Sequence, residues 1–123
     1  MQKNNFLLIS IIMNCHNGEK YLRHSIRSIL NQKYKNWELI FWDNRSNDNS
    51  KKILLSFKDK RIKYFCSKKF NSLYKSRNLA IKKSSGKFIS FLDVDDWWDA
   101  NKLKDQVDLI KKKNNVKFIY SNF

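Results

Sequence analysis

Two kinds of hydrophobic pattern alternate along this chain of 123 residues. Short apolar runs with the length of buried strands lie at residues 6–13, 37–42, 61–65, 87–92 and 116–120. Apolar residues at helical spacing lie between successive runs, at residues 21–30, 50–57, 73–81 and 103–110. This strand–helix alternation predicts an α/β fold with a mostly parallel sheet flanked by helices.

Capping residues mark the ends of the third and fourth predicted helices. Asn71 or Ser72 can cap the third helix, and Gly86 stands where its C-terminus would be released. Asp99 is placed to cap the fourth helix, which Asn114 closes before the last strand. Each helix then forms the crossover connection that parallel strands require.

Polar residues directly follow three of the predicted strands. They occupy residues 14–17, 43–48 and 93–99. The carboxyl ends of parallel strands lie at one edge of a sheet, and ligands of such sheets bind there. We therefore expect the three polar loops to meet in one site.

Length and composition indicate one folded domain over residues 1–123. Hydrophobic residues make up 41% of the chain, which is ordinary for a folded protein, and there is no proline or internal repeat. The formal net charge of +15 would attract nucleic acid, anionic lipid, nucleotide phosphates or acidic glycans. The lysines are scattered along the chain, which favours solvated helix faces over a dedicated nucleic-acid surface.

The cysteines and the N-terminal segment bear on location. Cys15 and Cys66 form no CxxC pair and have no zinc-like cluster around them, which fits a reducing cytoplasmic setting. The first apolar run is short for a signal peptide, and no run approaches the roughly 20 residues of a membrane helix. These features predict a soluble cytoplasmic protein that is at most attached to the inner face of an anionic membrane.

The most distinctive chemical feature is a cluster of aspartates. Four of the eleven acids lie within residues 93–99, after an apolar strand in an otherwise basic chain. With Asp99 assigned to capping, Asp93, Asp95 and Asp96 remain, and adjacent carboxylates are relieved of repulsion by protonation, a cationic side chain or a divalent metal. Solvated turn residues are the alternative. The position at a strand end favours a metal site, with Mg²⁺ or Mn²⁺ as the cation.

The scarcity of glycine restricts how a nucleotide could bind. Only Gly18 and Gly86 are present, so neither a G-x-G-x-x-G motif nor a Walker loop can be written. The phosphates of a nucleotide diphosphate would have to be neutralised by a metal and by basic side chains. A carboxylate-bound cation that bridges a diphosphate also stabilises it as a leaving group, which is the chemistry of glycosyl transfer.

Three segments in order resemble the N-terminal half of family 2 glycosyltransferases of the GT-A fold. They read ISIIMNCHNGEKYLRHSIRSILNQ, WELIFWDNRSNDNS and SRNLAIKKSSGKFISFLDVDD, and together they cover most of the chain. The resemblance implies a Rossmann-like fold, a nucleotide-diphosphate sugar as donor, and a glycan or lipid-linked acceptor.

The resemblance also implies roles for individual residues. The nucleotide-sugar-binding residues would be Asn14, His16, Asn17, Asp43, Asn44, Arg77, Asp93 and Asp95. The metal ligands would be Asp95 and Asp96, within a DxD-type element that begins at Asp93.

The sequence departs from the family pattern at three points. His16 occupies a position that is typically Tyr, and Asn44 replaces an acid, although its amide still offers a donor and an acceptor to a base edge. The family's catalytic base and most of the acceptor site would lie beyond Phe123. We therefore expect this chain alone to bind the donor without transferring sugar.

Two other functional classes fit the sequence less well. A haloacid-dehalogenase-like phosphatase also uses aspartates after a strand, but Trp97 occupies the Thr/Val position of its DxDx[TV] motif. A nucleic-acid-binding domain fits the charge, yet the chain contains no recognisable motif of that class. Trp97 and Trp98 could form a sugar platform, while packing is the commoner role of adjacent tryptophans.

Overall fold

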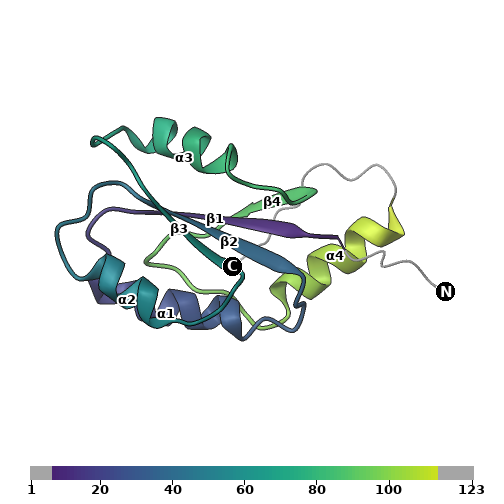
Figure 1. The fold of residues 1–123 in the computed structure, drawn as a ribbon. Coiled ribbons are helices and arrows are strands. Elements are labelled where there is room, and N and C mark those ends of the chain that lie inside the picture. The colour runs from purple at the N-terminus through teal and green to yellow at the C-terminus, as the bar shows by residue number, and fades with distance from the viewer. Residues whose placement is uncertain (1–6, 114–123) are drawn as a thin grey trace.

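The computed structural model describes residues 7–113 and contains four parallel strands and four helices within them (Figure 1). In chain order these are β1 (Ile9–Cys15), α1 (Glu19–Leu30), β2 (Trp37–Asp43), α2 (Ser50–Ser56), β3 (Ile62–Cys66), α3 (Leu73–Ile81), β4 (Phe88–Phe91) and α4 (Lys102–Lys112). The strands pair in the order β3-β2-β1-β4. The predicted α/β fold is confirmed, while the strand predicted at 116–120 and the role of Asn114 lie outside the described residues.

The two faces of the sheet carry cores of different size. Odd-numbered residues of β1, such as Ile11 and Met13, join a large cluster with apolar residues of α1, α2 and α4. Ile12 and Trp42, on the other face, belong to a small cluster beneath α3. Figure 1 shows α3 alone on its side of the sheet, with the other helices opposite. Burial on both faces explains why β1 and β2 are nearly continuous apolar runs.

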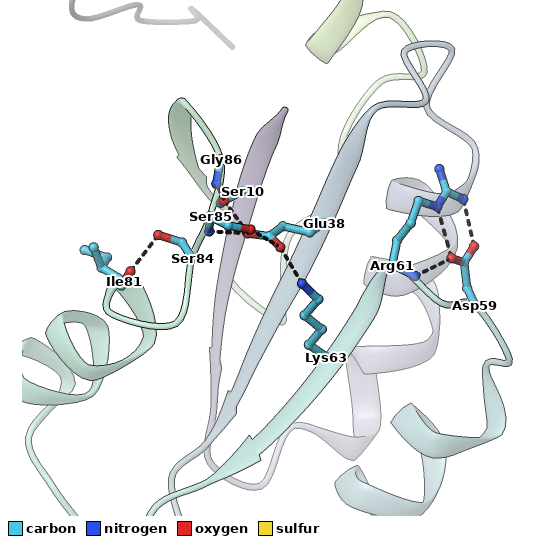
Figure 2. Close-up of polar contacts among 9 residues, drawn as sticks. All are labelled: Ser10, Glu38, Asp59, Arg61, Lys63, Ile81, Ser84, Ser85 and Gly86. Atoms are coloured by element: carbon cyan, nitrogen blue, oxygen red, sulfur yellow. Dashed lines mark hydrogen bonds and ion pairs between the residues drawn. The ribbon is translucent and has the colours of Figure 1, made fainter. Parts of the chain in front are cut away.

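A buried carboxylate ties the amino ends of the strands together (Figure 2). Glu38 on β2 accepts hydrogen bonds from Ser10 Oγ at 2.7 Å, Lys63 Nζ at 2.8 Å and the Ser85 backbone N–H at 2.6 Å. Burial alone would raise the pKa of Glu38, but these hydrogen bonds prevail and lower it to about 2. The cluster therefore links β1, β2, β3 and the loop that enters β4.

Gly86 belongs to this loop and not to a helix end, so its predicted role was wrong. Helix α3 ends at Ile81 with Lys82 in right-handed geometry, four residues before Gly86. The Gly86 N–H donates to Ser10 Oγ at 2.8 Å, and an added Cβ would lie 2.5 Å from that oxygen and 2.7 Å from the Leu8 carbonyl. Glycine is required because the loop passes against the backbone of β1.

The two predicted helix caps had different outcomes. Ser72 is the N-cap of α3 and accepts from the Lys75 N–H at 3.2 Å, which confirms one of the two candidates. The prediction for Asp99 was wrong, because α4 begins at Lys102 and Asp99 instead accepts from the Asn101 N–H in the preceding turn. The buried side chain of Gln32 accepts from the Leu103 N–H at 3.1 Å. A residue just past the end of α1 thus accepts a hydrogen bond from the first turn of α4.

Candidate functional site

The loops after β1 and β2 are bound to each other by hydrogen bonds. Asn17, which has the left-handed φ of 54° that asparagine tolerates, receives a bond from the Asn47 N–H on its Oδ1, and its own N–H donates to Ser46 Oγ, each at 2.8 Å. The Gly18 N–H donates to Ser50 Oγ at 2.9 Å. These bonds hold the two loops as one unit at the carboxyl edge of the sheet.

Gly18 also brings the loop after β4 to this unit. A Cβ on Gly18 would lie 3.0 Å from both Cys15 Sγ and Val94 Cγ2. Val94 stands between the aspartates of the strand-end cluster, so the absence of a side chain lets the loops after β1 and β4 pack closely. The strand order reverses between β1 and β4, and this switch point is where ligands of open α/β sheets bind.

His16 is exposed and held in a defined orientation. Its Nδ1 lies 2.7 Å from the Asn44 carbonyl oxygen, so Nδ1 must carry the proton of that bond. In the neutral ring Nε2 is then an acceptor, and Asn17 Nδ2 lies 3.4 Å from it. The ring meets the edge of Phe70 with centroids 4.9 Å apart. His16 and Phe70 together present an aromatic surface at the carboxyl edge.

Asp43 and Asn44 lie at the predicted edge, but both side chains are buried and already hydrogen-bonded. Asp43 Oδ1 accepts from the Ser46 N–H at 2.9 Å, and Oδ2 accepts from the Tyr64 hydroxyl at 2.6 Å. Burial, followed by the bond and charge of Asp43, raises the pKa of Tyr64. Asn44 makes two bonds to the backbone of Asn71, at 2.7 and 2.9 Å. These side chains therefore shape the loops after β2 and β3.

Asn14 lies at the end of β1 on the α3 face of the sheet. It is half-buried, and its Oδ1 has no hydrogen-bond partner within residues 7–113. In the pairing of β1 with β2, Asn14 lies opposite Trp42. Direct contact of Asn14, Asp43 and Asn44 with a nucleotide stays a prediction.

The aspartates after β4 come together as predicted. Asp93, Asp95 and Asp96 are exposed, and each offers a carboxylate oxygen within 4.8 Å of the others. Three carboxylate oxygens at this spacing suit a hard divalent cation such as Mg²⁺ or Mn²⁺. Arg77 reaches from α3 to place its guanidinium 3.6 Å from Asp93 Oδ1 and over the ring of Phe91. The Arg77 guanidinium therefore offsets part of the negative charge of the three aspartates.

An open cavity of about 570 Å³ lies beside the aspartates. Its lining includes Arg77, Asp93, Asp96, Trp97, Trp98 and Lys102. Trp98 is buried in the core, whereas Trp97 is 62% exposed and its ring meets His24 edge-on. Trp97 is therefore the tryptophan with a ring face exposed to a ligand. The sequence did not show which of the two adjacent tryptophans would be exposed.

Several residues of the site were not singled out from the sequence. Ser46 lies within the polar run after β2 and Ser50 begins the helix that follows it, and these positions were the only signal for them. Tyr64 and Phe70 gave no signal, because their roles depend on which strands and loops become neighbours.

Comparison with known proteins agrees with this geometry. The profile described as Glycosyl transferase family 2 matches residues 10–122. The UDP-Glc:alpha-D-GlcNAc-diphosphoundecaprenol beta-1,3-glucosyltransferase WfgD of Escherichia coli is 45% identical over 94% of this chain and 46% of its own length. WfaP of the same species, which carries the same description, is 34% identical over 94% of this chain and 46% of its length. The chain spans about half the length of these curated relatives.

A solved structure shows the same fold. The crystal structure of S. aureus TarS in complex with UDP-GlcNAc superposes with a TM-score of 0.83 at 27% identity, over 86% of this chain and 32% of that one. The profile match, the relatives and this superposition together show that the chain belongs to glycosyl transferase family 2 and has the GT-A fold of its N-terminal half.

Proposed function

We propose that this chain binds the donor of a glycosyltransferase reaction, a nucleotide-diphosphate sugar, through a divalent cation held by Asp93, Asp95 and Asp96. The observation that carries the proposal is the convergence of the three carboxylates at the switch point of the sheet, with Arg77 3.6 Å from Asp93. A Mg²⁺ or Mn²⁺ ion there would neutralise the diphosphate and stabilise it as a leaving group.

The other predicted residues divide by what they can reach. His16 and Asn17 are exposed at the carboxyl edge and are assigned to the nucleoside. Asp43 and Asn44 hold the neighbouring loops after β2 and β3, through Ser46 and Asn71. Arg77 offsets the charge of the aspartates and stands at the rim of the cavity, where it can meet the donor phosphates.

The relatives suggest the donor and the acceptor. WfgD and WfaP are described as transferring from UDP-Glc to a GlcNAc attached to diphosphoundecaprenol. We assign UDP-glucose as the donor and a sugar on a lipid diphosphate as the acceptor, with Trp97 available as a stacking face for a sugar.

Calorimetry of nucleotide binding tests the proposal. UDP should bind in Mn²⁺ and lose most of its affinity in EDTA, and GDP and dTDP in Mn²⁺ measure the preference for the base. Asp95→Asn and Asp96→Asn should each remove the Mn²⁺-dependent part of the affinity. Asp99→Asn is the matched control, because Asp99 lies in the same loop, outside the carboxylate cluster. Equal UDP affinity in EDTA and in Mn²⁺ would exclude the proposed role of the carboxylates.

A further inference from the structure

Charge is strongly segregated in the middle of the chain. Residues 60–92 contain no aspartate or glutamate. They contain ten basic residues: Lys60, Arg61, Lys63, Lys68, Lys69, Lys75, Arg77, Lys82, Lys83 and Lys87. This segment runs from the start of β3 through α3 to the end of β4, so the positive charge belongs to one region of the fold.

Some of these cations are neutralised by acids from elsewhere in the chain. Arg61 pairs with Asp59, Lys63 with the buried Glu38, and Arg77 with Asp93. The other seven are exposed and make no ion pair with a carboxylate within residues 7–113. Five of the seven lie between the end of β3 and the turn after α3. They are Lys68, Lys69, Lys75, Lys82 and Lys83.

These five lysines surround one groove. The groove has a volume of about 520 Å³, and Trp42, Phe65 and Leu79 provide its apolar lining. Helix α3 packs on β1 and β2, which leaves the groove beside the edge strand β3. We call the five lysines together with this apolar lining the lysine groove.

Exposed apolar side chains stand next to the lysine groove. Phe70 is 63% exposed, Leu73 55% and Tyr74 78%, all in the β3–α3 connection or the first turn of α3. Lysines mixed with exposed aromatic and aliphatic side chains are typical of proteins that bind the surface of an anionic bilayer. The five cations are all lysines and Leu73 offers no stacking surface, so the composition favours a bilayer over a single-stranded nucleic acid.

We propose that the lysine groove, with Phe70, Leu73 and Tyr74, docks the protein on an anionic phospholipid surface. Asn71 connects this surface to the carboxyl edge, because its backbone is bound by the side chain of Asn44. Docking would therefore hold the donor site close to the bilayer. The inference rests on the proposed function in one respect, since a lipid-linked acceptor is what makes a membrane the relevant surface.

Co-sedimentation of the full chain with vesicles tests the inference without any nucleotide. The vesicles contain phosphatidylglycerol and phosphatidylethanolamine, and pure phosphatidylcholine vesicles serve as the neutral reference. The variant Lys68→Gln/Lys69→Gln/Lys75→Gln should bind the anionic vesicles about a hundredfold more weakly than the wild type, because each lysine near an anionic surface contributes about fivefold. Leu73→Ser/Tyr74→Ser should lower the binding that remains at high salt.

A matched control removes the same charge from the opposite edge of the sheet. Lys33, Lys35 and Lys58 are exposed in the loops that enter β2 and β3. The variant Lys33→Gln/Lys35→Gln/Lys58→Gln should bind anionic vesicles within a few-fold of the wild type. Equal loss in both triple variants would overturn the inference, because it would show attraction by net charge alone.

Two further measurements separate the possible failures. Calorimetry of UDP binding in Mn²⁺ should be unchanged in Lys68→Gln/Lys69→Gln/Lys75→Gln, so that lost vesicle binding with intact UDP binding identifies the docking surface. Failure of the wild type to bind anionic vesicles, with UDP binding intact, would sink the inference and leave the proposed function standing. The inference would also be overturned if the wild type bound a single-stranded oligonucleotide tightly but did not bind anionic vesicles, and if Lys68→Gln/Lys69→Gln/Lys75→Gln abolished the oligonucleotide binding.

Discussion

Asp43 and Asn44 show at the scale of single residues how a side chain can build a ligand site without facing solvent. The sequence placed both at the carboxyl edge, since they end an apolar run, and the structure agrees. Their hydrogen-bond partners, Tyr64 and the Asn71 backbone, come from β3 and the following loop. A single sequence does not say which atoms of another segment will face a carboxyl group, so the buried state of these two residues was not predictable.

Asn44→Asp restores an acid where the family usually has one, yet it should destabilise this protein. Asn44 Nδ2 donates to the Asn71 carbonyl at 2.7 Å, and a carboxylate would place two acceptors against each other there. We expect the free energy of unfolding in urea to fall by about 1–3 kcal/mol. Asn47→Asp, at an exposed position of the same loop, should change it by less than about 0.5 kcal/mol. An Asn44→Asp variant as stable as the wild type would show that the loop after β3 is not held by this side chain.

Glu38 predicts a pH dependence of stability. Its pKa falls from 4.5 to about 2 on folding, so its ionised form contributes stability above pH 4.5 that is lost as the pH falls toward 2. The difference in unfolding free energy between the wild type and Glu38→Gln should therefore be largest near neutral pH and shrink across that window. Asp108→Asn, at an exposed pair with Lys104, should show a small difference throughout. A Glu38→Gln difference that does not change with pH would contradict the assigned ionisation.

At the scale of elements, strands and helices followed from the hydrophobic pattern, whereas the roles of two residues expected at helix ends, Asp99 and Gly86, did not. The pattern gives β1, α1, β2, α2, β3, α3 and β4 within a few residues of their bounds. The start of α4 and the role of Gly86 depend on Gln32 and Ser10, which are distant in the sequence. Local capping rules fail at such positions because the hydrogen-bond partner comes from a residue distant in the sequence and not from the neighbouring residue that the rules consider.

Gly86→Ala tests the close approach of this loop to β1. The added methyl group would lie 2.5 Å from Ser10 Oγ and 2.7 Å from two backbone atoms, so the backbone has to move. We expect a loss of about 1–3 kcal/mol in unfolding free energy, measured by thermal or urea denaturation. Gly18→Ala is the matched control, because its methyl group would meet only the side chains of Cys15 and Val94, at 3.0 Å, and should cost less. A larger loss for Gly18→Ala would contradict this explanation.

At the scale of the whole molecule, the strand order brings three loops that are distant in the sequence to one edge. The alternation of strands and helices was enough to predict this meeting, because parallel strands all end on the same side. The order β3-β2-β1-β4 then places the loops after β1 and β4 at the switch point. The cavity, the unequal covering of the two faces and the lysine groove depend on side-chain packing and were not visible in the sequence. Within residues 7–113, no helix is long and apolar enough to cross a bilayer.

We expect the chain alone to bind the donor without transferring sugar. Asp43 and Asp48, the acids of the loop after β2 at the carboxyl edge, are poorly placed to act as a general base. Asp43 is 2% exposed with both oxygens bonded, and Asp48 accepts from the Ser50 and Glu19 N–H groups. Burial would raise the pKa of Asp48, but these bonds prevail and lower it. An assay with UDP-glucose and lipid-linked acceptors should show no turnover, whereas turnover lost on Asp43→Asn or Asp48→Asn, with UDP binding kept, would identify a base within the chain.

The central claim is that Mn²⁺ and a nucleotide diphosphate bind together at Asp93, Asp95 and Asp96. Electron paramagnetic resonance measures it directly, because the sharp signal of free Mn²⁺ is lost when the ion is bound. Titrating the chain into Mn²⁺ and UDP should remove far more of that signal than the chain or UDP does alone. The same titration with Asp95→Asn/Asp96→Asn should remove no more than UDP alone. The account would be contradicted if UDP did not increase the loss of free Mn²⁺ signal caused by the wild type. It would also be contradicted if Asp95→Asn/Asp96→Asn removed as much of that signal as the wild type does.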